Sequence, residues 1–185
     1  DLTEQRCLLP QLGAGLDSQS AVNGYYSQND YIEILKYAQA HFIEVIPSLD
    51  MPGHSRAAIV AMEARFNRLI GQGKSEQALQ YRLVEPADKT QYSSIQHYQD
   101  NTLNVCLEST YQFIDKVLDE VNALHVQAGV PLKTYHIGAD ETAGAWVDSP
   151  SCRRLQNQQP ALHSFKKSVP WSLKKALKWP DGATV

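Results

Sequence analysis

Hydrophobic side chains along the chain recur in two spacings that predict two helix-strand units. In residues 31–40 they fall three or four positions apart, directly after a cluster of capping residues at 27–30, which predicts a helix. A largely apolar run at residues 42–49 predicts the strand that follows. The same order returns as a helical pattern over residues 108–126 and a short apolar strand over 130–137, with Pro131 at its entry. Alternating helices and buried strands are typical of a parallel α/β sheet.

Between and beyond these units the pattern changes. Residues 56–70 carry apolar side chains on one face only, as expected of a helix that crosses back over a sheet. Residues 71–94 are polar and are expected to form an extended insertion. After Cys152 the chain turns basic, with a short amphipathic helix predicted at 172–179. We therefore expect one unit at residues 1–152 and a divergent basic tail at 153–185.

Composition and charge narrow the class of protein. The chain has 185 residues, a formal net charge of -3 and 20% charged residues, an ordinary globular composition. No run approaches the roughly 20 apolar residues of a membrane span, so none is predicted. The absence of a basic stripe argues against a nucleic-acid partner. The start, Asp1-Leu2-Thr3, has neither an initiator methionine nor a signal-peptide pattern, which predicts a mature or excised segment.

The three cysteines leave two interpretations open. Cys7, Cys106 and Cys152 are odd in number and scattered, and none forms a pair with metal-ligand spacing. A disulfide involving one or more of them and a set of buried free thiols are about equally compatible with this pattern.

The candidate chemistry centres on an adjacent acid pair at the end of the second predicted strand. Small residues flank Asp140 and Glu141, which leaves open space around two carboxyls at the end of a strand where parallel α/β folds bind ligands. Adjacent acids repel, so their pKa values are pushed apart and one tends to stay protonated near neutrality. This suits acid catalysis on a glycosidic oxygen, a poor leaving group unless protonated. A solvated acid pair at a helix N-terminus is the structural alternative.

A second polar motif follows the first predicted strand. Asp50-Met51-Pro52-Gly53-His54 would lie at the same edge as the acid pair if the strands are parallel. Pro52 and Gly53 predict a tight turn that aims His54 over that edge. Asp50 could orient the turn by hydrogen bonding, or be purely structural.

These motifs resemble those of a known family. His136-Ile137-Gly138-Ala139-Asp140-Glu141 resembles the catalytic signature of glycoside hydrolase family 20, the β-N-acetylhexosaminidases. Val45-Ile46-Pro47-Ser48-Leu49-Asp50-Met51-Pro52-Gly53-His54-Ser55 is similar to the family's preceding barrel strand. Residues 81–133 are similar to the bacterial chitobiase-like branch, so the resemblance extends to about Cys152.

The resemblance implies a fold. We expect an α/β structure that is part of a (β/α)8 TIM barrel and covers roughly its third and fourth strands. A complete barrel needs at least about 200 residues, so the chain is expected to be an internal fragment whose apolar faces and strand edges lack cover. The family's sugar-gripping arginine and the aspartate that orients its histidine come from earlier strands, which predicts weak activity for the isolated chain. A periplasmic, outer-membrane-associated or secreted parent is also implied.

The resemblance also implies a reaction. Family members remove terminal β-linked N-acetylglucosamine or N-acetylgalactosamine with retention, using the substrate's acetamido oxygen as nucleophile, without metal or organic cofactor. By resemblance Glu141 is the general acid and base, Asp140 holds the acetamido N–H, and His54 hydrogen-bonds the acid. Asp50 is a supporting candidate from its place in the turn alone. The partner would be an amino-sugar oligosaccharide such as chitobiose or a glycoconjugate end.

Two other functions remain as alternatives. A metal-dependent hydrolase could use His54, His136, Asp140 and Glu141 as ligands. A non-catalytic fragment could bind amino sugars, or another partner, without turnover.

Overall fold

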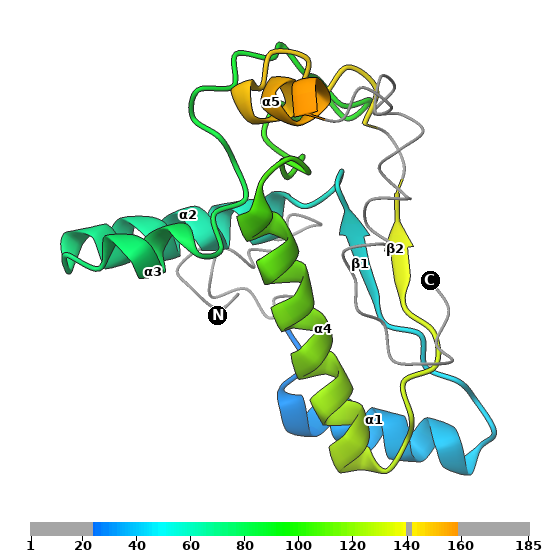
Figure 1. The fold of residues 1–185 in the computed structure, drawn as a ribbon. Coiled ribbons are helices and arrows are strands. Elements are labelled where there is room, and N and C mark those ends of the chain that lie inside the picture. The colour runs from blue at the N-terminus through cyan, green and yellow to red at the C-terminus, as the bar shows by residue number, and fades with distance from the viewer. Residues whose placement is uncertain (1–23, 140–141, 159–185) are drawn as a thin grey trace.

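The computed structural model describes residues 24–139 and 142–158. They form five helices and two strands (Figure 1), in the order α1 (Gln28–Ala40), β1 (Ser48–Met51), α2 (Arg56–Gly71), α3 (Ser75–Leu79), α4 (Glu108–Ala128), β2 (His136–Gly138) and α5 (Pro150–Gln158). The predicted helix at 172–179 and Cys7 lie outside the described residues.

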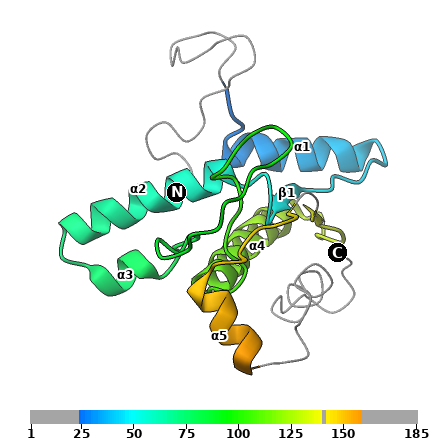
Figure 2. The same cartoon turned by 90° about the horizontal axis from the view of Figure 1, so that it is seen from above.

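The two strands form a parallel pair, which confirms the predicted α/β class. Ser48 aligns with His136 and Met51 with Gly138, with one irregularity between the two pairs. The arrows lie side by side and point the same way, with α4 alongside and α1 crossing beneath (Figure 1). Seen from above, α2 and α3 project to one side of the molecule (Figure 2). The C-terminal ends of both strands therefore share one edge of the sheet.

The three long helices begin and end close to their predicted bounds, and local signals define the start of α1 and the end of α4. At the start of α1 the Ser27 hydroxyl accepts a hydrogen bond from the Asp30 N–H (3.1 Å), and the Asp30 carboxylate accepts one from the Ser27 N–H (2.8 Å). This reciprocal pair is a capping box. At the end of α4, Gly129 has a φ of 71°, the left-handed conformation that glycine adopts without steric cost.

The predicted strands were too long and began too early. The run at 42–49 contributes only its last two residues to β1, and the run at 130–137 contributes its last two to β2. Strand bounds depend on where the two chains meet in register, which apolar content does not encode. Just before the two strands, a hydrogen bond from the His136 N–H to the Pro47 carbonyl (2.9 Å) continues the contact between the two segments by one residue.

The interpretation of residues 71–94 as an extended insertion was only partly right, because Ser75–Leu79 form α3, whereas residues 80–94 contain no helix or strand. This segment contains α3, which packs on α2, and its side chains Ala78 and Leu83 are buried. Arg82 forms a two-pronged ion pair with Glu63 of α2, with nitrogen-oxygen distances of 2.9 and 3.0 Å. Buried positions here are separated by polar residues, so no periodic pattern marks them, and tertiary packing decides the structure.

One apolar cluster joins the sheet to the helices and to the segment between α3 and α4. Its helical members lie in α2, α4 and α5. The buried members are Met51, Ala58, Ile59, Ala61, Met62, Leu83, Leu103, Val105, Phe113, Ile114, Tyr135, Trp146 and Cys152. Burial raises the pKa of Tyr135 to about 12, so its hydroxyl stays neutral at physiological pH.

The two faces of the sheet differ sharply. Leu49 and Ile137 pack against the core, whereas Ser48, Asp50 and His136 are exposed. Side chains alternate between faces along a strand, so the polar residues share the face that points away from the core. The Ser48 hydroxyl and His136 Nδ1 lie 2.9 Å apart across the two strands.

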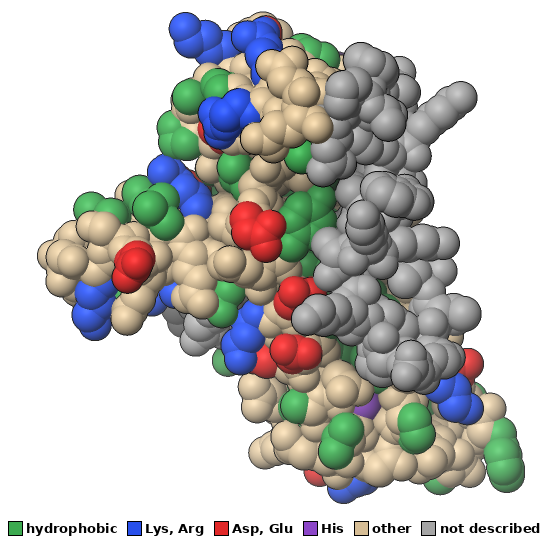
Figure 3. Space-filling model, in the orientation of Figure 1, with side chains coloured by type: hydrophobic (Ala, Val, Ile, Leu, Met, Phe, Trp, Pro, Cys, Tyr) green, Lys and Arg blue, Asp and Glu red, His purple; other side chains and the backbone are tan. Residues whose placement is uncertain are grey.

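Several large apolar side chains remain exposed around α1. Phe42, just past its C-terminus, is 99% exposed, and Tyr25, Tyr26, Tyr37 and Ile43 are also largely exposed. Figure 3 shows hydrophobic side chains standing apart over α1. Residue 152, where the sequence predicts a domain boundary, lies inside α5, and the division of the chain there stays a prediction.

A buried histidine joins α1 to α4. His125 is 2% exposed, with its Nδ1 3.0 Å from the Val130 carbonyl and its Nε2 3.0 Å from the Tyr31 hydroxyl. Because a carbonyl only accepts, Nδ1 carries the proton and Nε2 accepts from Tyr31. Burial lowers the pKa of His125, and the hydrogen bond to the Val130 carbonyl only partly opposes this.

This arrangement predicts that the protein loses stability as the pH falls below neutrality. The unfolded chain takes up a proton near the ordinary histidine pKa of 6.5, whereas the folded chain does so only at a lower pH. The stabilisation is complete above pH 6.5 and falls by at most about 1.4 kcal/mol per pH unit between the two pKa values. Urea unfolding at pH 7.5 and 5.5 measures it.

The matched variants are His125→Gln and His97→Asn. The first should remove most of this pH dependence. The second replaces an exposed histidine with φ 64°, a conformation asparagine tolerates, and should retain it. Equal pH dependence in the wild type and His125→Gln would contradict the prediction.

Candidate functional site

The first candidate motif forms a tight turn at the C-terminal end of β1. The Met51-Pro52 peptide bond is cis, and the Ser55 hydroxyl donates to the carbonyls of Asp50 (2.5 Å) and Gly53 (3.2 Å). His54 has a φ of 55° and an exposed side chain, at the point where the chain turns into α2. The predicted turn is confirmed, and it presents His54 on the surface beside the strand end.

The segment that precedes α4 holds this turn in place. The Ser55 N–H donates to the Asn101 carbonyl (2.8 Å), and the Leu103 N–H donates to the Pro52 carbonyl (2.9 Å). Pro52 and Ser55 are buried as a result. The turn is therefore fixed from both sides, by β1 and by residues 101–103.

The second candidate motif begins at the end of β2. Gly138 and Ala139 both have a φ of 69°, so the backbone turns sharply as it leaves the strand. A left-handed φ costs a residue with a side chain of order 1–3 kcal/mol, and such residues cluster at functional sites. Asp140 and Glu141 follow directly and lie outside the described residues. Because β1 and β2 are parallel, the chain enters this pair at the sheet edge that carries residues 50–54.

After the acid pair, the chain forms a compact loop from Thr142 to Ser149. The Ala145 N–H donates to the Thr142 carbonyl and the Ser149 N–H to the Trp146 carbonyl, both at 3.2 Å. Trp146 is 7% exposed, and its indole N–H donates to the Leu103 carbonyl (3.1 Å). The loop is thus anchored in the core on the same segment that holds the His54 turn.

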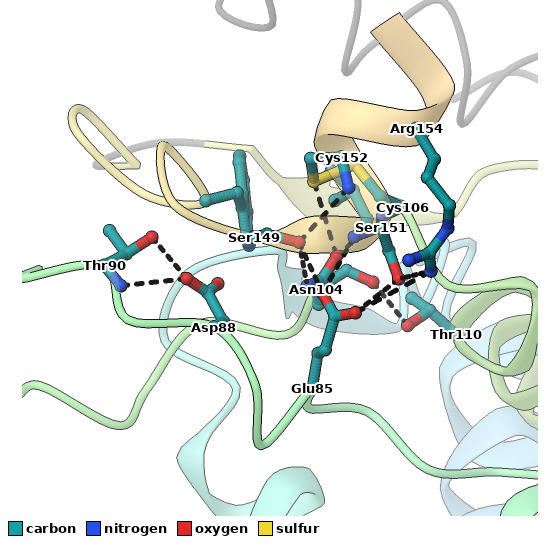
Figure 4. The surroundings of a disulfide bond; sticks show 12 residues. Glu85, Asp88, Thr90, Asn104, Cys106, Thr110, Ser149, Ser151, Cys152 and Arg154 are labelled. Atoms are coloured by element: carbon teal, nitrogen blue, oxygen red, sulfur yellow. Dashed lines mark hydrogen bonds and ion pairs between the residues drawn. A yellow bond between two sulfur atoms is a disulfide. The ribbon is translucent and has the colours of Figure 1, made fainter. Parts of the chain in front are cut away.

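A carboxylate fixes the far end of this loop. The Ser149 hydroxyl donates to Glu85 Oε2 (2.6 Å), the Ser151 N–H donates to the same oxygen (3.1 Å), and the Ser151 hydroxyl donates to Oε1 (2.7 Å). Figure 4 shows Glu85 pointing at both serines at the start of α5. The sequence analysis missed Glu85, since nothing distinguishes a single acid in a polar stretch. Ser149-Pro150 was a usable signal, because serine followed by proline often begins a helix.

A disulfide bond also fixes the start of α5. Cys106, just before α4, is bonded to Cys152 in α5, 46 residues later in sequence (Figure 4). Of the two interpretations left open by the sequence, the disulfide is confirmed for this pair.

A cavity of about 300 Å³ lies beside the loop. Its walls include Ile59, Glu85, Tyr92, Asp100, Asn104 and Trp146. Its acids already have partners, because Glu85 holds the serines and Asp100 forms an ion pair with Arg56 at 2.9 Å. In the part of the chain that the structure describes, no three His, Cys, Asp or Glu side chains are grouped to hold a metal. No helix among the same residues is long and apolar enough to span a membrane.

The chain is similar to known proteins along most of its length. Residues 3–181 match the family "Glycosyl hydrolase family 20, catalytic domain". The chain is 72% identical over 156 residues to beta-hexosaminidase B of Pseudoalteromonas piscicida, covering 84% of this chain and 20% of that protein. It is 51% identical over 142 residues to N,N'-diacetylchitobiase of Vibrio harveyi, covering 76% and 16%.

Two solved structures are also similar to this chain. A GH20 exo beta-N-acetylglucosaminidase from Vibrio harveyi, solved in complex with N-acetylglucosamine, has a TM-score of 0.61 and 36% identity, over 87% of this chain and 22% of that one. An inactive mutant of the Vibrio harveyi enzyme gives a TM-score of 0.63. The chain spans about a fifth of the length of the curated relatives it matches.

The disulfide predicts a measurable loss of stability on its removal. The double variant Cys106→Ala/Cys152→Ala should lower the free energy of unfolding by about 2–4 kcal/mol, because a cross-link that closes a 46-residue loop restricts the unfolded chain. Urea unfolding measures this loss. Mass spectrometry after alkylation, with and without prior reduction, verifies the bond in the wild type. An unchanged unfolding midpoint in the double variant would contradict the prediction.

Proposed function

Because this chain belongs to glycosyl hydrolase family 20, with a match over residues 3–181, we propose that the protein is a chitobiase-like β-N-acetylhexosaminidase. It would remove terminal β-linked N-acetylglucosamine or N-acetylgalactosamine from amino-sugar oligosaccharides. The observation that carries the proposal is the parallel pairing of β1 and β2, which brings residues 50–54 and the chain entering Asp140 to one sheet edge. The names of relatives, a chitobiase and beta-hexosaminidases, support the substrate class.

In this proposal the acid pair performs the chemistry and the substrate supplies the nucleophile. The acetamido oxygen attacks the anomeric carbon while Glu141 protonates the leaving oxygen. Glu141 then removes a proton from the water that opens the intermediate. Asp140 holds the acetamido N–H and offsets the positive charge that develops there. His54 hydrogen-bonds the acid and orients it, and Asp50 supports the pair from β1. No step needs a metal or an organic cofactor.

We also propose where the chain lies in the barrel of its family. β1 and β2 correspond to roughly the third and fourth barrel strands, and the match to about a fifth of each relative supports a part of the barrel. The exposed apolar side chains around α1 are consistent with surfaces covered by further parts of a longer protein. Residues 153–185 would form a divergent tail.

An extracytoplasmic location is part of the proposal. The Cys106–Cys152 disulfide supports an oxidising compartment, because such bonds persist mainly in secreted and periplasmic proteins. A periplasmic, outer-membrane-associated or secreted protein fits this chemistry.

The test is Glu141→Gln in the longest natural form of the protein that contains these residues. Hydrolysis of N,N'-diacetylchitobiose should fall by at least about 100-fold in kcat/KM, the usual contribution of a general acid. Glu120→Gln, an exposed acid of α4 paired with Lys116, is the matched control and should leave the rate unchanged.

The same assay separates the alternatives. Loss of activity in chelator, with stoichiometric zinc or manganese in the purified protein, would favour the metal-dependent hydrolase. Binding of the disaccharide without turnover, unaffected by Glu141→Gln, would favour an amino-sugar-binding protein.

A further inference from the structure

The turn after β1 buries every residue from 51 to 55 except His54. Met51, Pro52, Gly53 and Ser55 are buried, whereas His54 between them is exposed. The turn leads from the end of the β1 arrow into α2 (Figure 1). The backbone conformation at residue 54 therefore decides where the imidazole lies at the sheet edge.

His54 has a backbone conformation that histidine does not favour by itself. Its φ of 55° lies in the left-handed region, which glycine enters freely and other residues enter at a steric cost. With a negative φ the Cβ atom would point in another direction and carry the imidazole with it. Such a conformation persists only where surrounding contacts hold it.

The hydroxyl of the next residue supplies such a contact. Ser55 is 3% exposed, and its hydroxyl oxygen lies 2.5 Å from the Asp50 carbonyl oxygen and 3.2 Å from that of Gly53. A hydroxyl has one hydrogen, so the shorter distance identifies Asp50 as the main acceptor. This bond joins β1 to the residue just beyond His54 and closes the turn around it.

This use of the hydroxyl is unusual for a serine at the start of a helix. Ser55 is the N-cap residue of α2, where a serine usually has an extended backbone and accepts a hydrogen bond from an N–H of the first turn, as Ser27 does in α1. Ser55 instead has a φ of -97° and a ψ of 20°, and its side chain makes no cap bond. The hydroxyl therefore stabilises the turn before α2 and not the helix.

Backbone hydrogen bonds fix the rest of Ser55. Its N–H donates to the Asn101 carbonyl (2.8 Å), and its carbonyl accepts from the Ile59 N–H (3.0 Å). Ser55 is thus held against both the segment before α4 and the first turn of α2. A variant that lacks only the hydroxyl can still form both bonds, so the side chain can be tested separately from these backbone contacts.

We propose that Ser55 is a positioning residue for the hydrolysis, whose hydroxyl holds His54 in the left-handed conformation and so fixes the direction of its imidazole. The proposal rests on the proposed function, which gives His54 its part in the reaction. Ser55 is buried and touches no substrate. Its contribution therefore reaches the reaction through His54, its neighbour in the chain.

The test is a double-mutant cycle in the longest natural form of the protein, with kcat/KM on N,N'-diacetylchitobiose as the readout. Ser55→Ala should lower kcat/KM by about ten- to a hundredfold, the scale of a misplaced catalytic group. His54→Asn removes the imidazole and introduces a residue that tolerates the φ of 55°. In that background Ser55→Ala should lower kcat/KM by less than about twofold, because no imidazole is left to position.

The cycle separates positioning from stability. A smaller folded fraction would reduce the rate by the same factor with and without the imidazole, whereas a lost position matters only when the imidazole is present. Should Ser55→Ala fail to fold, Ser55→Gly removes the same hydroxyl at a position where glycine is also a favoured N-cap. It should show the same dependence on His54.

The matched control is Ser109→Ala. It removes another serine hydroxyl that donates to a backbone carbonyl at 2.5 Å, that of Arg82. This hydroxyl joins α4 to the connection between α3 and α4, and not to the His54 turn. Its removal should leave kcat/KM on chitobiose unchanged.

Two kinds of result would overturn the inference, and they are distinguishable. If His54→Asn and Glu141→Gln are both impaired, an equal loss from Ser55→Ala in the two backgrounds, or no loss at all, would mean that the Ser55 hydroxyl does not position His54. Unimpaired hydrolysis in His54→Asn or Glu141→Gln would instead remove the proposed function of that residue, and this inference with it.

Discussion

Two parallel strands cannot be joined by a tight turn, and this constraint governs the whole chain between Met51 and His136. The connection must leave the end of β1 and return to the start of β2, and here it contains α2, α3, an extended segment and α4. Its apolar side chains cover one face of the sheet and form the core with Met51 and Tyr135. The opposite face keeps polar residues, including Asp50 and His136.

The same connection also organises the candidate site. Residues 101–103 hold the turn that presents His54, and the Leu103 carbonyl accepts from Trp146 in the loop after the acid pair. Glu85 fixes the far end of that loop, where the Cys106–Cys152 disulfide adds a covalent link. Glu85 and residues 101–103, which showed no motif in the sequence, thus hold both the His54 turn and the loop after the acid pair.

Local patterns were sufficient for much of the fold. The three long helices were predictable because each carries an apolar stripe encoded within a few residues, to which α1 adds a capping box at Ser27 and α4 a terminal Gly129. The alternation of helices and strands predicted a parallel sheet for the same reason. The strand bounds were not predictable, since β1 and β2 are defined by pairing between residues 88 positions apart, as in the contact of Ser48 with His136.

The sequence by itself determined the family, through the motifs that contain His54 and Glu141, and the class of chemistry that those motifs imply. Side-chain type and spacing along the chain suffice for that, because a motif is local. Only the tertiary structure decided that Cys106 pairs with Cys152 and that Glu85 holds the turn at Ser149. These partners come from distant segments, and their geometry exists only once the crossover has folded back onto the strands.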